Sequence, residues 1–211
     1  MALSGWSTSN YIGKSSALLT AVPLTMACWF NVTASPGAGA FTLIDLHASG
    51  SNATSNNFKL QVTGTSPNIS VVAQTSGSGA ASSGASTGVW AHGCSVFSAI
   101  NARAAFLNGA NKGTNAASQT PTGINQARIG IVGGSAPGNA VNGRIAEAAI
   151  WNVALSDDEV AALGKGFSPR LIRPSALVAY LPIIRDFIDV KGAGFSVTGS
   201  LTVADHCAIR G

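Results

Sequence analysis

The stretch GRIAEAAIWNVALSDDEVAAL, residues 143–163, predicts a strand that runs directly into a short helix. Ser156 is a favourable N-cap residue, and Glu159 stands at the third helical position, so the two residues complete a capping box. We therefore expect one short helix near residues 156–163, ended by Gly164. The fold then depends on which strands accompany this unit.

Three consecutive carboxylates, Asp157, Asp158 and Glu159, begin the predicted helix. They stand out because only 9% of the chain is charged, where about 25% is usual. The helix dipole favours negative charge at a helix N-terminus, and the Glu159 side chain has its own place in the capping box. We therefore interpret this acidic cluster as structural and not as catalytic.

Almost every other segment has the pattern of a short strand bounded by Gly, Ser, Asn or Pro. Asn108-Gly109 predicts a hairpin, because these residues readily adopt the two positive-φ positions of a type I′ turn. Residues 77–88 are rich in Gly, Ser and Ala, and we expect a linking loop there. Short strands separated by frequent turns are typical of an all-β antiparallel sandwich. The remaining predicted strands are residues 24–32, 40–47, 58–64, 69–75, 89–99, 127–134 and 176–183, with a short hairpin or strand pair in 195–204.

The composition suits a protein that packs against other copies of itself. The formal net charge of the 211-residue chain is +4, and small neutral residues must cover most of its surface. Few charges keep such surfaces apart in a free monomer. Residues 165–211 carry six basic and three acidic side chains, which favours attraction of this tail to an acidic protein surface. No basic run with interleaved aromatic residues indicates nucleic-acid binding.

The N-terminal sequence MALSGWSTSNYIG has neither the basic nor the apolar segment of a signal peptide. No stretch approaches the roughly 20 apolar residues of a transmembrane helix, so we expect no membrane contact. Cys28, Cys94 and Cys207 are far apart and lack metal-binding spacing, which predicts free thiols in a protein made in a reducing compartment. The alternative for Cys207 is an intermolecular disulfide.

Carboxylates are too sparse for the paired arrangement that glycoside hydrolysis requires. Asp45 is the only carboxylate in the first 146 residues, and Glu147 stands alone on its predicted strand. A lone carboxylate lacks the second group that acid–base catalysis needs. We expect Glu147 to pair with Arg144 or Arg128, or to accept backbone N–H groups.

The other candidate binding side chains also have structural explanations. A calcium ion near Asp45, helped by Asn52 or Asn56, would have few carboxylate ligands. We therefore predict no catalytic, cofactor-binding or metal-binding residue. Tryptophans can stack on sugars, but only Trp6 is expected at an exposed or intersubunit position. The three that lie in apolar strand patterns and are expected in the core are Trp29, Trp90 and Trp151.

The order of these motifs resembles the laminin-G-like, concanavalin A-like jelly roll. The resemblance covers about residues 1–164 and depends most on the final motif, GRIAEAAIWNVALSDDEVAAL. It implies two antiparallel sheets packed face to face. The positions that match the family pattern are Trp29, Trp90, Asn108, Gly109, Gly143, Glu147, Asn152, Leu155, Ser156, Glu159 and Leu163.

The tail carries a second resemblance. LIRPSALVAYLPI and VTGSLTVADHCAIRG resemble the C-terminal extension of laminin-G-like proteins in tailed-phage genomes, which usually has Pro where Cys207 stands here. This resemblance implies a virion component, such as a capsid decoration protein or a fibre-type appendage. We accordingly divide the chain into a laminin-G-like sandwich, residues 1–166, and a C-terminal extension, residues 167–211, that packs on the sandwich or on a neighbouring subunit.

Two functions remain open. The first is a structural, non-enzymatic virion protein that decorates the capsid exterior, with the major capsid protein and sibling subunits of a homotrimer as partners. The second is a carbohydrate-binding, lectin-like module of a phage fibre or surface protein, with host glycans as ligands. The expected location is the virion, at the capsid surface, after assembly in the bacterial cytoplasm. We expect no cofactor and no nucleic-acid partner, and the missing carboxylate pair disfavours a glucanase.

Overall fold

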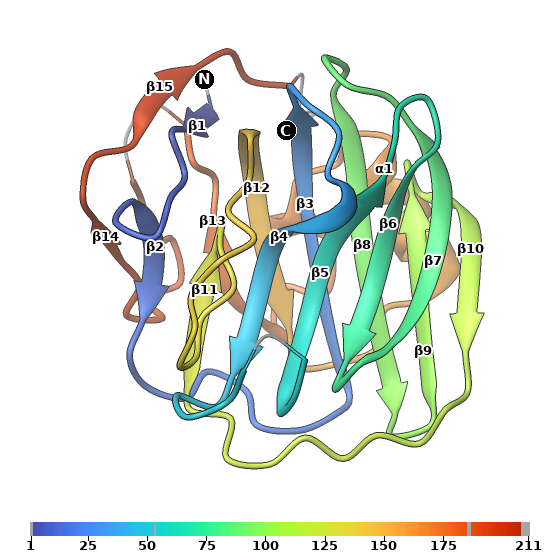
Figure 1. Cartoon of the computed structure of the whole chain (residues 1–211). Coiled ribbons are helices and arrows are strands. Elements are labelled where there is room, and N and C mark those ends of the chain that lie inside the picture. The colour runs from blue at the N-terminus through green and yellow to red at the C-terminus, as the bar shows by residue number, and fades with distance from the viewer. Residues whose placement is uncertain (1, 53, 185–186, 208–211) are drawn as a thin grey trace.

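The computed structural model describes residues 2–52, 54–184 and 187–207, which form two antiparallel sheets packed face to face (Figure 1). The expected all-β jelly-roll sandwich with one short helix is confirmed. The eight-stranded sheet has the order β10 (Ala110–Asn115), β9 (Ala102–Leu107), β8 (Ala91–Ala99), β3 (Leu24–Val32), β12 (Gly143–Trp151), β1 (Ala2–Ser4) and β15 (Thr202–Ala204), with β13 (Leu177–Leu181) also paired to β12. The seven-stranded sheet has the order β14 (Ser196–Thr198), β2 (Tyr11–Lys14), β11 (Gln126–Ile129), β4 (Gly37–His47), β5 (Asn57–Gly64), β6 (Ile69–Thr75) and β7 (Ser78–Ala85).

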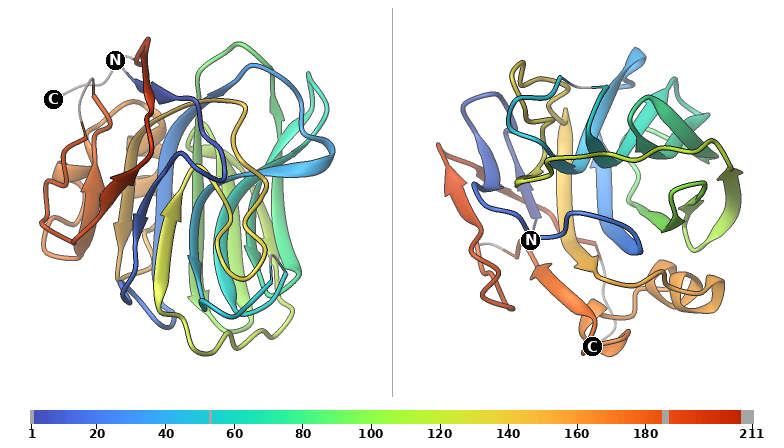
Figure 2. Two further views of the ribbon diagram at one scale, coloured as in Figure 1. Left: turned by 60° about the vertical axis from the view of Figure 1, so that its left-hand side comes forward. Right: turned by 90° about the horizontal axis from the view of Figure 1, so that it is seen from below.

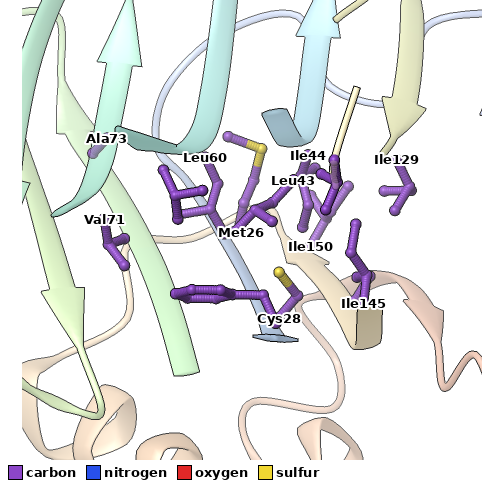
Figure 3. Close-up of a cluster of buried hydrophobic side chains, with 14 of the residues drawn as sticks. Met26, Cys28, Leu43, Ile44, Leu60, Val71, Ala73, Ile129, Ile145 and Ile150 are labelled. Atoms are coloured by element: carbon purple, nitrogen blue, oxygen red, sulfur yellow. The ribbon is translucent and has the colours of Figure 1, made fainter. Parts of the chain in front are cut away.

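The main hydrophobic core fills the space between the two sheets. Because side chains alternate along a strand, every second residue of the central strands points into this space. Figure 3 shows Met26, Cys28 and Ile150 of the eight-stranded sheet facing Leu60 and Ile44 of the seven-stranded sheet. All five side chains are almost fully buried. Their burial is the main source of stability that holds the sheets together.

A bulge divides β12 into two halves with different neighbours. Glu147 has a φ of 53°, and the register of β12 with β3 shifts between Ala146 and Ala149. On the opposite edge, the first half of β12 pairs with β1 and the second half pairs with β13. One edge of β12 therefore accepts both the N-terminal strand and a strand of the tail.

The predicted helix is α1 (Asp157–Gly164), and its capping box is confirmed. Glu159 Oε2 accepts a 2.8 Å hydrogen bond from the Ser156 backbone N–H, and Ser156 Oγ accepts one from the Glu159 N–H. The helix ends at Gly164, as expected, although Gly164 is itself helical and Lys165 is the C-cap. A Cβ at Gly164 would lie 2.4 Å from the backbone nitrogen of Gly109, so a glycine permits close contact with the β9–β10 turn.

The predicted hairpin at Asn108-Gly109 is also confirmed. Asn108 and Gly109 have φ values of 52° and 72°, as a type I′ turn requires. The expectation of a loop at residues 77–88 is wrong, because Ser78–Ala85 form β7 along the edge of the seven-stranded sheet. Small residues suit this position, since β7 lies close to β9 and β10 of the other sheet (Figure 1).

The C-terminal tail adds strands to both sheets. β13 pairs with β12 and β15 with β1, whereas β14 pairs with β2. The two short strands expected in residues 195–204 are present, but they belong to different sheets and do not pair with each other. Between these strands the tail runs along the outside of the eight-stranded sheet and over one flank (Figure 2). Arg185, Asp186 and Arg210, three of the charged tail residues, lie outside the described residues.

No helix in the described ranges has the length and the apolar character needed to cross a membrane. The helices there are α1 and a 3₁₀ turn at Pro169–Leu171.

The β7–β10 flank provides a test of the packing. A Cβ at Gly113 of β10 would lie 1.8 Å from the carbonyl oxygen of Ala81 in β7. Gly113→Ala is therefore expected to lower the free energy of unfolding by about 1–3 kcal/mol, because the two backbones must separate. Chemical denaturation measures this change. The matched control is Gly50→Ala, where a Cβ meets nothing within 4 Å, and an equal loss in both variants would contradict the assignment.

Candidate functional site

The outer face of the seven-stranded sheet carries an unusual number of buried polar side chains. On β5, Leu60 and Val62 belong to the core between the sheets, so the alternate residues Lys59, Gln61 and Thr63 point to the opposite face. Lys59 and Gln61 are only 2% and 5% exposed. Polar groups buried to this degree need partners in the protein or in a ligand.

The strand register aligns four of these outward residues across the sheet. Arg128 of β11 is opposite Asp45 of β4, Asp45 is opposite Lys59 of β5, and Lys59 is opposite Gln74 of β6. We call this alignment the polar row. Its alternating charges make it electrostatically favourable, because directly opposed side chains of opposite charge attract each other.

One part of the polar row is covered by residues 131–139, which follow β11. The Gly133 N–H donates a 2.8 Å hydrogen bond to Asp45 Oδ2, which also lies 3.0 Å from His47 Nδ1. His47 Nε2 lies 3.0 Å from Gln126 Oε1. A Cβ at Gly133 would lie 2.0 Å from the His47 ring, so only glycine lets this segment approach. Asp45 and His47 are therefore sealed from solvent and hold the covering segment in place.

The other part of the polar row is open. A hollow of about 430 Å³ lies over β5, β6 and the start of β4, and we call it the outer-face groove. Gln61 Oε1 at its floor is buried and has no hydrogen-bond partner among the described residues. Burial lowers the pKa of the Lys59 ammonium, while the Asp45 carboxylate opposes this shift. The lining consists of Ala38, Gly39, Ala40, Thr54, Lys59, Gln61, Thr63, Val72, Gln74, Gly79 and Asn139.

The residues considered for calcium do not converge on one point. Asn52 Oδ1 accepts hydrogen bonds from Thr54 and Ser55, and Asn56 Oδ1 accepts one from the Thr122 N–H. Asp45 is the only carboxylate on β4, β5, β6 and β7. Within the described ranges there is no cluster of three or more His, Cys, Asp or Glu side chains able to hold a metal ion.

Glu147 lies on β12 of the eight-stranded sheet, whereas the groove lies on the seven-stranded sheet. Its side chain is only 3% exposed. The hydroxyl of Tyr180 donates a 2.5 Å hydrogen bond to Glu147 Oε2, and His206 Nε2 lies 3.4 Å from Glu147 Oε1. The expected pairing with Arg144 or Arg128 is therefore wrong, because β13 and the end of the tail reach this carboxylate first. Glu147 connects the tail to the sandwich.

The tryptophans and Cys207 differ in part from the sequence-based expectation. Trp151 is buried as expected, but Trp6 is also buried, at 6% exposure, because it joins the core between the sheets. Trp29 and Trp90 are only partly buried, since they lie on the outer face of the eight-stranded sheet against Cys207. Burial raises the pKa of the Cys207 thiol to about 12, so it is a poor partner for thiol exchange while the tail is docked.

Comparisons with known proteins agree with this fold. A family model described as the concanavalin A-like lectin/glucanases superfamily matches residues 6–161. No curated protein matches the sequence.

Among solved structures, a heptameric SAP-like pentraxin from Limulus polyphemus has a TM-score of 0.60 and 17% identity, covering 90% of this chain and 88% of the pentraxin. A putative carbohydrate binding protein from Bacteroides ovatus has a TM-score of 0.62 and 16% identity, covering 95% of this chain and 58% of that protein. The enzymatically active domain of a bacteriophage CBA120 tailspike protein has a TM-score of 0.57 and 18% identity, covering 84% of this chain and 29% of the tailspike chain. At these identities the likeness shows the fold.

The hydrogen bond from Gly133 to Asp45 predicts that the Gly133 amide loses protection from hydrogen exchange when Asp45 is replaced. Asp45→Asn removes the negative charge that attracts His47 and weakens the bond to Gly133, so the free energy of unfolding should fall by about 1–3 kcal/mol. Amide hydrogen exchange should accelerate at Gly133 before the core strands are affected. Asp158→Asn, which removes an exposed carboxylate, is the control. Unchanged exchange at Gly133 would contradict the proposed role of Asp45.

Proposed function

The chain belongs to the concanavalin A-like lectin/glucanases superfamily, and on that premise we propose that it is a non-catalytic carbohydrate-binding protein. The observation that carries the proposal is the outer-face groove, a hollow of about 430 Å³ on a rigid sheet with amide and hydroxyl groups along its floor. Binding sites for small ligands combine concave shape with a few well-placed polar groups. The printed description of the Bacteroides ovatus structure as a putative carbohydrate binding protein agrees with this function.

The lining of the groove matches the chemistry of a neutral saccharide. Sugar hydroxyls both donate and accept hydrogen bonds, and side-chain amides can satisfy both roles. The Gln61 side chain lines the groove, and its buried Oε1 has no hydrogen-bond partner among the described residues. Gln74 and Thr63 line the same groove from neighbouring strands. Two strands thereby hold the polar groups rigidly, which limits the entropy lost on binding.

The absence of carboxylates from the groove supports binding without catalysis. Glycoside hydrolysis uses two carboxyl groups about 5–9.5 Å apart on either side of the scissile bond. The described lining contains none, and Asp45 is sealed under residues 131–139. Glu147 is engaged by Tyr180 on the other sheet.

A glycan array with the full chain, followed by calorimetry on the best ligand, tests this proposal. We expect Gln61→Ala and Gln74→Ala each to weaken binding about tenfold, because each removes a hydrogen-bonding amide from the floor. Gln119→Ala is the matched control, since Gln119 donates to Ser78 and does not line the groove. No glycan signal above background, with or without calcium, would contradict the function. Binding unaffected by both groove variants would contradict the site.

The exposed apolar side chains of the tail support a second proposed function, assembly on a virion. Among the described residues, six of the eight exposed large hydrophobic side chains lie in the tail. An apolar surface on a chain with so little charge favours association. The exposed side chains of the tail are Phe167, Leu171, Ile184, Ile188, Val197 and Val203.

The more specific form of this second proposal is capsid decoration by a homotrimer, with the tail against the major capsid protein or sibling subunits. Multiple copies would then turn weak single contacts into durable attachment. The phage tailspike similarity is consistent with a virion location. Quantitative mass spectrometry of purified particles tests it: a copy number comparable with that of the major capsid protein supports decoration, and absence from the particles contradicts it.

Self-association through the tail has its own test in solution. Light scattering after size exclusion should give an oligomer for the natural chain, and Leu171→Asp with Ile188→Asp should shift it towards monomer, because the charges must be desolvated on contact. Val89→Asp with Ile100→Asp is the control, since Val89 and Ile100 are exposed to a similar degree but lie outside the tail. A natural chain that stays monomeric at every concentration would contradict association through sibling subunits.

A further inference from the structure

A hollow of about 290 Å³ lies in the tail, between the 3₁₀ turn at Pro169–Leu171, the start of β13 and the segment that contains Val190. We call it the tail hollow. Its lining shares no residue with the outer-face groove, so the two are separate surfaces. The lining residues are Arg170, Pro174, Leu177, Val190 and Lys191.

The floor of the tail hollow is apolar and held in place. Leu177 belongs to the buried cluster that contains Tyr180, and Val190 packs against the same cluster. The Val190 N–H donates a 3.0 Å hydrogen bond to the Tyr180 carbonyl. Asp189 Oδ2 accepts hydrogen bonds from the Gly194 and Phe195 N–H groups at 2.8 and 3.0 Å, which fixes the turn that follows. A site formed before the ligand arrives loses little entropy on binding.

Two exposed cations stand at the rim of the tail hollow. Neither Arg170 nor Lys191 forms an ion pair with a carboxylate of the described residues. The Lys191 ammonium has only a long contact, at 3.4 Å, to the Pro174 carbonyl oxygen. The carboxylate nearest in sequence, Asp189, is engaged by backbone N–H groups. The rim therefore attracts a negatively charged ligand.

Exposed apolar side chains follow the same two segments. Leu171 comes directly after Arg170, and Ile188 lies two residues before Val190. They are 57% and 53% exposed. Contact surfaces of proteins combine an apolar centre with polar groups at the rim. This surface therefore fits a segment in which an apolar side chain is flanked by carboxylates.

A second copy of this chain is a poor source of such a segment. Six of the seven acidic side chains among the described residues already accept a hydrogen bond or lie against a cation, and Asp158 is the exception. Sibling copies therefore offer little unpaired negative charge. The six engaged carboxylates are Asp45, Glu147, Asp157, Glu159, Asp189 and Asp205.

We propose that the tail hollow docks an acidic segment of a different protein, with one apolar side chain in the hollow and carboxylates on Arg170 and Lys191. The guanidinium of Arg170 can hold a carboxylate through two parallel hydrogen bonds, and the ammonium of Lys191 acts as a point charge. This inference rests on the proposed attachment through the tail, and it names the chemistry of the partner. Because the charges are exposed, binding should weaken as salt is raised.

Fluorescence anisotropy of the full chain with a labelled peptide tests the proposal. The probe has one leucine flanked on each side by two glutamates. Arg170→Glu and Lys191→Glu should each weaken its binding about tenfold or more, because each places like charges opposite one another. Lys14→Glu is the matched control, since it reverses one charge on β2, away from the hollow. The same peptide with glycine in place of leucine should bind several-fold more weakly.

The double variant Arg170→Glu with Lys191→Glu gives a prediction that loss of folding cannot mimic. It should bind the peptide in which lysines replace the glutamates, which the natural chain should not bind. These measurements use no particles, so they can fail or succeed separately from the copy number in the virion. No saturable binding of the acidic peptide, equal binding of the lysine peptide by the natural chain, or binding unaffected by both single variants would each overturn the proposal. An oligomer of the natural chain that the double variant dissociates would assign the hollow to sibling copies and would also overturn it.

Discussion

The bulge at Glu147 is the constraint on which the arrangement of the chain depends. A regular β12 would offer one continuous edge to one neighbour, but the bulge lets β1 take the first half and β13 the second. Bulges of this kind redirect a strand at the cost of one unpaired residue. Here the bulged residue is also a buried carboxylate, and Tyr180 and His206 of the tail satisfy it. Removal of the tail would take away both of these partners, so the tail contributes to the stability of the fold.

The few charged residues of the chain have two different structural roles. Most of the described acidic residues stabilise local structure, as at the capped N-terminus of α1. The polar row instead places Arg128, Asp45 and Lys59 under or beside covering segments on the outer face of the seven-stranded sheet. Burying such groups is costly unless they are paired, and the cost is offset by the contacts of Asp45 with Gly133 and His47. A rigid polar floor results, and the part left uncovered is the groove that we propose for saccharides.

The molecule presents different surfaces in different directions. The groove is polar and lies on the outer face of the seven-stranded sheet, whereas most of the exposed large apolar side chains of the described residues lie in the tail. A protein attached to a particle through its tail would keep the outer-face groove available for glycans. Carbohydrate binding and virion attachment are therefore compatible functions of one chain, because they would use separate surfaces.

Local chemistry within the sequence determined the capping box at Ser156 and Glu159, the turn at Asn108-Gly109 and most central strands, because these signals depend on neighbours a few residues away. The family resemblance extended them to a two-sheet sandwich. The sequence alone did not predict the groove. Strand register places Asp45, Lys59 and Gln74 side by side, and register depends on pairing between residues far apart in the chain. Residues 77–88 were expected to be a loop because small residues give no strand signal, whereas packing against the opposite sheet makes them β7. The sequence by itself determined the local elements and the class of fold, and only the tertiary structure decided which polar side chains share a surface, because that depends on contacts between residues far apart in the chain.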